Sequence, residues 1–263
     1  MPAAVGQRPA GVYDAGTGPT VLLLHGVPTS GALWRPVATR LVDAGMRVIV
    51  PDLPGWGGSA PLNSNPTPAA HAVWLTQLLG MLRVSDPVVA GQDFGGLLAL
   101  ELLVRGTARA AALTSAWAGL GWMAARATAL PGLERIFYRR YGGRLYISHG
   151  AAPDRQAAAR ATFGPALEDP RRVPQMRAIA RGLSPYRLAP LAWKARRTGR
   201  PIRCIWGADD PFVPARASRL VGWQLGAAVD LIPGARHLAP FDRPDDFAAA
   251  LLRFVESIQP DTA

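Results

Sequence analysis

Short apolar runs alternate with helix-like segments along most of this chain, and this alternation constrains the fold more than any other feature. The clearest runs cover residues 20–24, 47–50, 87–90, 110–114, 202–206 and 229–232. They are almost continuously apolar, as strands buried on both faces of a parallel sheet are. The segments between them predict helices at about 34–44, 68–82, 95–105, 214–222 and 244–257. The pattern predicts an α/β protein with a mostly parallel sheet flanked by helices.

Residues 117–197 interrupt the alternation. This stretch is helix-biased, rich in Arg, Tyr, Trp and Pro, and contains no strong strand, and a buried strand resumes at Ile202. The 263 residues suffice for one core of this type and are short for two. We therefore predict one core built from residues 1–116 and 198–263, with residues 117–197 inserted as a helical cap.

Composition and charge exclude several classes of protein. Hydrophobic residues make up 49% of the chain, which excludes wholesale disorder. The net charge of +11 comes almost entirely from dispersed arginines without a binding motif, so we expect no nucleic-acid partner. With neither an apolar leader nor a run of roughly 20 apolar residues, we expect a soluble cytoplasmic protein without membrane contact. The single cysteine, Cys204, lies in a predicted buried strand and is expected to be an inert core thiol.

Asp93 stands at the junction between a predicted strand and a predicted helix. The strand is followed by Gly91-Gln92-Asp93-Phe94-Gly95-Gly96, a G-x-D-x-G-G pattern that leads into the helix. Small residues at Gly91 and Gly95 permit a tight turn, and a helix N-terminus favours a negative charge. The alternative is that Asp93 only caps the helix. The pattern resembles the nucleophile elbow of α/β-hydrolases, G-x-S-x-G, with Asp93 in place of the serine.

A second segment, His25-Gly26-Val27-Pro28, resembles the H-G-x-P loop of the same superfamily. The resemblance implies that the backbone N–H of Val27, together with that of Phe94, forms an oxyanion hole. His25 is then expected to be a packing residue.

The predicted acid and base follow in the order that this fold uses. The segment from Gly207 to Pro214 resembles the family's G-x-x-D-x-x-x-P acid loop, a spacing that selects Asp210 and leaves Asp209 as the alternative. His237 follows the last predicted strand, and the order Asp93, Asp210, His237 matches nucleophile, acid and histidine.

These residue types suit a two-step reaction at an sp³ carbon. Asp93 would attack the carbon to give an alkyl-enzyme ester, and His237, oriented by Asp210, would activate the water that hydrolyses it. A carboxylate suits ordinary esters poorly, because its attack on them would give a high-energy mixed anhydride. An epoxide or an alkyl halide is the more reasonable substrate.

The leaving group separates the two substrate classes. Haloalkane dehalogenases hold the halide with side-chain N–H donors at positions that here carry Phe94 and Val27, which have none. Epoxide hydrolases use cap tyrosines as donors, and Ser184-Pro185-Tyr186-Arg187 resembles the segment of one of them. Phe137-Tyr138-Arg139 loosely resembles the other, with Tyr141 and Tyr146 as alternatives to Tyr138. Simple packing within the cap is the competing explanation for these tyrosines.

The sequence analysis therefore favours an epoxide hydrolase that produces a vicinal diol. A haloalkane dehalogenase is the first alternative, and a non-hydrolytic pocket protein of natural-product biosynthesis is another. One departure is that epoxide hydrolases commonly read H-D-W where this chain reads Gln92-Asp93-Phe94. Aromatic residues of the cap indicate a hydrophobic, partly aromatic substrate. They are Trp117, Trp122, Phe137 and Trp193. No cofactor or metal is implied, and the oligomeric state stays open.

Overall fold

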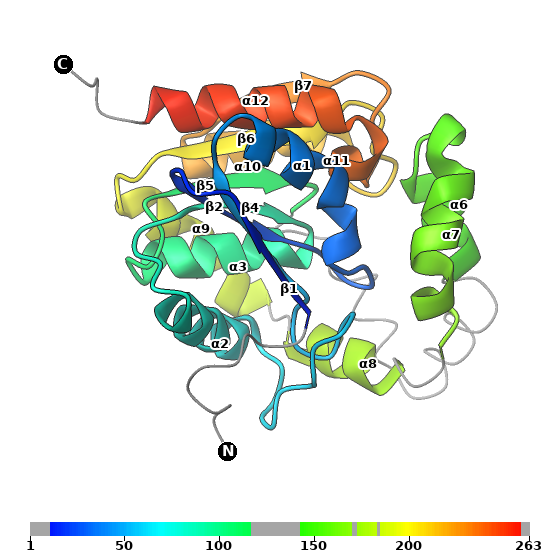
Figure 1. Cartoon of the computed structure of the whole chain (residues 1–263), viewed down its shortest axis with the longest axis horizontal. Coiled ribbons are helices and arrows are strands. Elements are labelled where there is room, and N and C mark those ends of the chain that lie inside the picture. Colours follow the sequence, from blue (N-terminus) through cyan, green and yellow to red (C-terminus); the bar gives the residue numbers. More distant parts are fainter. Residues whose placement is uncertain (1–10, 117–142, 170–172, 183–184, 259–263) are drawn as a thin grey trace.

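The computed structural model describes residues 11–116, 143–169, 173–182 and 185–258, without the side chains of 143–145, 173, 182 and 185–189. A seven-stranded sheet runs through its centre (Figure 1). The strands are β1 (Val12–Ala15), β2 (Thr20–Leu24), β3 (Arg47–Pro51), β4 (Val88–Gln92), β5 (Ala110–Thr114), β6 (Ile202–Gly207) and β7 (Ala228–Ile232). Their order is β1-β3-β2-β4-β5-β6-β7. The predicted α/β fold is confirmed.

All six predicted strands are present to within two residues, and all of them pair in parallel. The sequence analysis missed β1, which pairs antiparallel with β3 at the edge of the sheet. Its four residues are only partly buried, so they lack the continuous apolar run by which the other strands were found.

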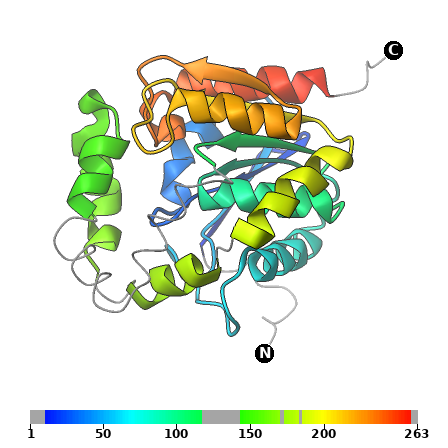
Figure 2. The ribbon, with the colours of Figure 1, turned by 180° about the vertical axis from the view of Figure 1, so that it is seen from behind.

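Helices cover both faces of the sheet (Figures 1 and 2). One layer consists of α1 (Arg35–Asp43), α11 (Ala239–Asp242) and α12 (Pro244–Ser257), with the short helix η1 (Gly31–Leu33) before α1. The other consists of α2 (Pro68–Met81), α3 (Phe94–Val104), α9 (Pro185–Arg197) and α10 (Ala215–Leu225). The five predicted helices are confirmed, and α10 extends three residues further because it stops at Gly226, whose φ is 67°.

The inserted stretch contains α6 (Gly143–Gly150), the short helix η3 (Pro153–Arg155), α7 (Gln156–Leu167), α8 (Val173–Gly182) and α9. Helices α6 and α7 stand beside the sheet in both ribbon views (Figures 1 and 2). Helix α9 instead packs on α3 and α10 and contributes Leu191 and Ala195 to the core. The predicted cap range of 117–197 thus ends on a helix that lies against the sheet layer, and the division into core and cap stays a prediction. Across the described ranges, no helix has both the length and the apolarity to cross a membrane.

Candidate active site

Asp93 occupies a strained turn between β4 and α3. Its φ of 52° and ψ of −117° are unusual for a residue with a side chain and cost about 1–3 kcal/mol. The turn is possible because Gly91 and Gly95 lack side chains. A Cβ on Gly95 would lie 2.2 Å from the carbonyl oxygen of Leu24. The geometry is that of the predicted elbow, which presents the Asp93 side chain at the carboxyl end of the sheet.

The Asp93 carboxylate receives hydrogen bonds from the backbone N–H groups of Phe94 and Val27. These are the two donors expected for the oxyanion hole. Burial raises the pKa of Asp93 to about 6, although His237 and the two N–H groups favour the charged form. At neutral pH the side chain is therefore mostly ionised.

His237 and Asp210 form a buried pair next to Asp93. The Nδ1 atom of His237 lies 3.1 Å from Oδ2 of Asp210, and the other carboxylate oxygen accepts the N–H groups of Phe212 and Val213 at 2.9 Å. Burial opposes a charge on the imidazole, but the nearby carboxylates, led by Asp210, outweigh burial and raise the pKa of His237. Asp209, the alternative acid, is exposed and instead accepts the N–H of Gly234.

Ser115 joins this pair and was missed in the sequence. Its hydroxyl lies 2.8 Å from Oδ2 of Asp210 and 3.1 Å from the carbonyl oxygen of His237, so its one hydrogen can reach either acceptor. Ser115 follows β5 directly and has a φ of 49°. A positive φ is uncommon outside glycine, and sequence alone does not reveal it.

Gln92 connects the three loops of the site. Its Nε2 donates to the carbonyl oxygen of His237 at 3.2 Å, and its Oε1 accepts the N–H of Gly26 at 3.0 Å. Gln92, one of the two residues that depart from the H-D-W pattern, thus ties β4 to the Val27 loop and to the His237 loop.

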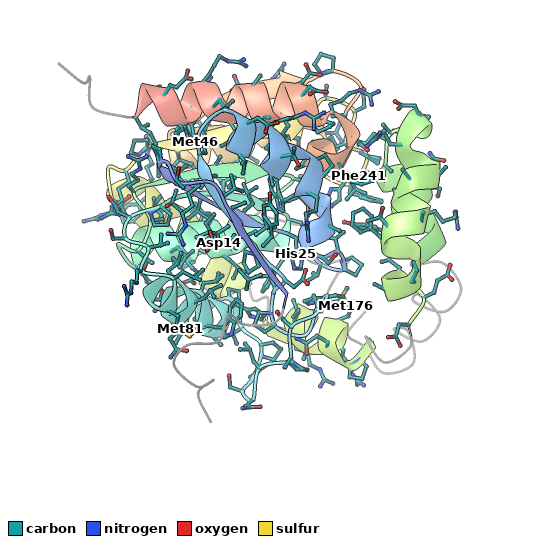
Figure 3. The ribbon with its side chains drawn as sticks, viewed as in Figure 1. Asp14, His25, Met46, Met81, Met176 and Phe241 are labelled. Carbon is teal, nitrogen blue, oxygen red and sulfur yellow. The ribbon has the colours of Figure 1, made fainter. Side chains whose placement is uncertain are left out.

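His25 is a structural residue, in agreement with the expected packing role. The N–H of Leu53 donates to its Nε2 at 2.8 Å, so Nδ1 carries the hydrogen and donates to Gly26. Burial lowers the pKa of His25 to about 4. Figure 3 shows it inside the molecule, at the start of the loop that follows β2.

Tyr146 of α6 lies against His237. Its ring is 5.7 Å from that of His237 in an edge-to-face arrangement and stacks on Phe212 at 5.9 Å. The hydroxyl is fully buried and makes no hydrogen bond of normal geometry to the described residues. Burial, followed by the Asp93 charge, raises the pKa of Tyr146 well above its usual value. The hydroxyl is therefore protonated and close to Asp93. The side chain of Gln92 lies near it and favours the charged form of the phenol, while the hydroxyl hydrogen has no acceptor among the described residues.

The two preferred cap tyrosines are not tested by this geometry. Tyr138 and Tyr141 lie outside the described residues, as do Trp117, Trp122 and Phe137. Tyr186 is in α9, with its side chain outside those described. Trp193, also in α9, is 62% exposed and does not line the site. The guanidinium of Arg197 lies over one face of its ring.

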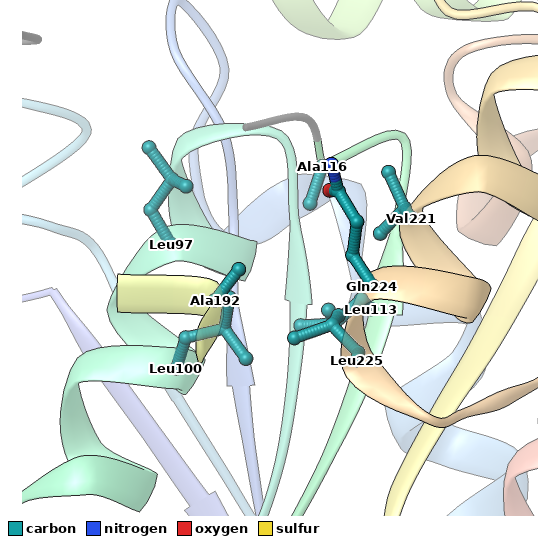
Figure 4. Close-up of a pocket in the computed structure, with 8 residues that line it drawn as sticks. All are labelled: Leu97, Leu100, Leu113, Ala116, Ala192, Val221, Gln224 and Leu225. Atoms are coloured by element: carbon teal, nitrogen blue, oxygen red, sulfur yellow. The ribbon is translucent and has the colours of Figure 1, made fainter. Parts of the chain in front are cut away.

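A small apolar pocket lies behind the nucleophile helix (Figure 4). It is enclosed by α3, α9, α10 and the end of β5, and its lining consists of Leu97, Leu100, Leu113, Ala116, Ala192, Val221, Gln224 and Leu225. Of these described side chains only Gln224 is polar, so the pocket offers none of the reacting groups. Within the described ranges, no three His, Cys, Asp or Glu side chains come together as metal ligands would.

Fold and site together define the class of protein. Residues 21–250 match the Alpha/beta hydrolase family, so the chain belongs to that family. A thermophilic esterase from Thermogutta terrifontis superposes with a TM-score of 0.80 at 24% identity and covers 95% of this chain and 94% of its own. That likeness concerns the fold alone.

Two kinds of hydrolase are among the sequence relatives. A haloalkane dehalogenase of Mycolicibacterium paratuberculosis (strain ATCC BAA-968 / K-10) is 29% identical over 259 residues, 92% of this chain and 85% of that protein. An epoxide hydrolase of Caballeronia sordidicola is 37% identical over 86 residues, 32% of this chain and 26% of that protein. The chain is a hydrolase of the α/β family with dehalogenases and epoxide hydrolases among its relatives.

Proposed function

We propose that this protein hydrolyses epoxides to vicinal diols through an alkyl ester on Asp93. The observation that carries the proposal is the buried, protonated hydroxyl of Tyr146 close to an ionised Asp93. One group is a nucleophile for carbon and the other a donor for oxygen, and epoxide opening needs both at once.

In the first step, a carboxylate oxygen of Asp93 attacks an epoxide carbon and the carbon–oxygen bond of the ring breaks. The departing oxygen receives a hydrogen bond, and then a proton, from Tyr146. The product is a hydroxyalkyl ester on Asp93.

In the second step, His237 removes a proton from water and the resulting hydroxide attacks the ester carbonyl of Asp93. The N–H groups of Val27 and Phe94 stabilise the oxyanion, and its collapse breaks the bond to the alkyl oxygen. That oxygen takes the proton of the new Asp93 carboxyl group, so that the diol leaves and the carboxylate is restored. The proton held by His237 returns to the Tyr146 phenolate that the first step left. Esterification removes one of the negative charges that raise the pKa of His237. The pKa of His237 therefore falls once the ester has formed, so that more of the imidazole is neutral in the step that requires a base.

Haloalkane dehalogenation is the second candidate, supported by the dehalogenase relative that spans 92% of this chain. The same nucleophile and base would serve it. The side chains of Phe94 and Val27 offer no N–H donor to a halide, which favours the epoxide.

Replacement of His237 by Gln should trap the ester, because the alkylation step stays possible while its hydrolysis loses the base. Intact mass spectrometry after exposure to aryl and alkyl epoxides should show an adduct equal to the epoxide mass, and peptide mapping should locate it on Asp93. The double variant with Asp93→Asn is the matched control and should show none. Adducts from bromoalkanes alone would establish the dehalogenase instead, and a folded variant without any adduct across the panel would refute covalent catalysis.

A further inference from the structure

Asp242, at the end of α11, is a buried carboxylate that the proposed reaction does not use. It is 2% exposed, and its two oxygens accept N–H groups from different parts of the chain. One oxygen accepts from Ala152, just after α6, at 2.9 Å. The other accepts from Arg236, directly before His237, also at 2.9 Å. The carboxylate therefore bridges the end of α6 and the base loop.

A second bond reinforces the same junction. The N–H of Leu238 donates to the carbonyl oxygen of Gly150 at 3.1 Å, so both neighbours of His237 in the chain are tied to residues 150–152. Close packing continues at Gly150, where a Cβ would lie 3.1 Å from the Phe212 ring and 3.7 Å from Cβ of His237. Tyr146 is one turn earlier in α6, so this junction sets where its ring meets His237.

The charges around Asp242 agree with an ionised carboxylate at neutral pH. Burial raises its pKa to about 6, the N–H groups and Arg243 oppose this rise, and Asp154 adds to it. Arg243 itself pairs with Asp154 at 3.0 Å on the exposed side. The guanidinium of Arg236 faces the carbonyl oxygens of Ser148 and His149, and that of Arg155 lies over the ring of Phe241. Figure 3 shows Phe241 on the side of the core that faces α6 and α7.

We propose that Asp242 is a positioning residue: its carboxylate holds the end of α6 against the base loop and thereby aligns the Tyr146 hydroxyl and the His237 imidazole beside Asp93. The catalytic importance of this alignment rests on the proposed function, since it matters only if Tyr146 and His237 serve the same reaction. The carboxylate also contributes to the negative charge that keeps His237 basic.

Asp242→Asn is the direct test, because an amide keeps one acceptor for two N–H groups and removes the charge. We expect kcat for epoxide hydrolysis to fall about 10- to 100-fold with a smaller change in KM, since misalignment affects the reacting groups rather than substrate binding. The acid limb of the ester-hydrolysis rate should move to lower pH, because His237 loses a neighbouring negative charge. A loss of folded protein alone would lower the amplitude without moving that limb.

Asp154→Asn is the matched control: it removes a carboxylate at the same junction that pairs with Arg243 but does not bind the base loop. We expect it to retain the parent kcat and pH profile. A folded Asp242→Asn protein with the parent kcat and acid limb would overturn the proposal, as would an Asp154→Asn protein with the same defects.

A measurement without substitution of Asp242 covers the case in which Asp242→Asn does not fold, and it is independent of the substrate. In the Asp93→Asn/His237→Gln protein, which lacks the carboxylate and the imidazole that titrate next to the Tyr146 ring, amide NMR signals of Ala152 and Arg236 should shift with one common midpoint near pH 6. The Tyr146 ring signals should follow the same midpoint. The positioning role would be overturned if the two amides had different midpoints, or if the Tyr146 ring signals did not shift at the midpoint of the amides. Either result would do so even if epoxide hydrolysis itself were established.

Discussion

At the scale of single residues, the site depends on Asp93, which is held in a strained conformation with an ionised carboxylate inside the protein. Two backbone N–H groups and the His237 imidazole favour that charge, and burial opposes it. The structure thereby keeps a reactive anion where a neutral side chain would be more stable. Function and stability oppose each other at this position.

This opposition gives a pH-dependent prediction for Asp93→Asn. Since burial raises the pKa of Asp93 to about 6, the folded chain binds this proton more tightly than the unfolded chain does. The protonated Asp93 side chain therefore favours the folded chain. Its contribution to the free energy of unfolding is fully present below about pH 4 and is lost as the pH rises through about 6. We expect the variant to gain up to about 3 kcal/mol in free energy of unfolding at pH 8, with the gain vanishing near pH 4. Urea unfolding at a series of pH values measures this, and an equal gain at both extremes would contradict charge burial as its source.

Tyr146→Phe tests the proposed oxygen donor and keeps the ring that packs on His237 and Phe212. In the His237→Gln background we expect epoxide adducts to form at least about 100-fold more slowly, because a positioned acid contributes that much or more. Hydrolysis of a preformed ester in the wild-type background should change little, since that step needs no donor to the departing oxygen. Tyr13→Phe, at the far edge of the sheet, is the control. Unchanged adduct formation in Tyr146→Phe would transfer the role to a tyrosine outside the described side chains.

At the scale of elements, the elbow depends on how closely α3 approaches β2 and β4. Gly91, Gly95 and Gly96 allow this approach, and a Cβ on any of them would lie within 2.3 Å of another heavy atom. The loops at the carboxyl ends of β2, β4, β5, β6 and β7 then bring Val27, Asp93, Ser115, Asp210 and His237 together. Catalytic groups of parallel α/β sheets gather at this edge for the same topological reason.

The glycines of α2 and α3 should therefore respond oppositely to alanine. Gly95→Ala forces a Cβ to 2.2 Å from a backbone oxygen, so we expect a loss of about 2–3 kcal/mol or more in free energy of unfolding. Gly80→Ala meets nothing within 4 Å and should instead stabilise α2 by about 0.5–1 kcal/mol. Urea unfolding of both variants compares them directly. Similar effects in the two helices would show that the close approach at the elbow is not what requires glycine.

At the scale of the whole molecule, the inserted stretch shares the cores of the sheet layers. Ile147, Ala159 and Phe163 belong to the same apolar cluster as α1 and α12, and Phe163 meets Phe241 edge-to-face at 5.3 Å. Leu191 and Ala195 of α9 join the cluster on the opposite face. The described parts of the insertion therefore pack as continuations of the core, which is how a helix such as α6 can bring Tyr146 to His237.

The sequence alone was sufficient for the six parallel strands of the sheet and for the strand–turn–helix that carries Asp93. Continuous apolar runs indicate strands that are buried on both faces, and the glycines around Asp93 indicate a turn that tolerates few other residues. The places of Val27, Phe94, Asp210 and His237 follow from the resemblance of short local segments to those of α/β-hydrolases. Such a resemblance is informative because each segment forms its loop largely by itself. The choice of Asp210 over Asp209 as the partner of His237 agrees with the distances.

Only the tertiary structure decided which residues support that site from elsewhere. Tyr146 was one of several tyrosines in a stretch without periodic signals, and its place beside His237 depends on the bonds of Asp242 and Gly150 across the junction. Ser115 bonds to Asp210 and Gln92 bonds to His237, and each of these pairs is separated by more than 90 positions in the chain. A local pattern encodes backbone geometry because sterics act between neighbours in the chain, whereas contacts between distant segments form only when the packed layers bring them together.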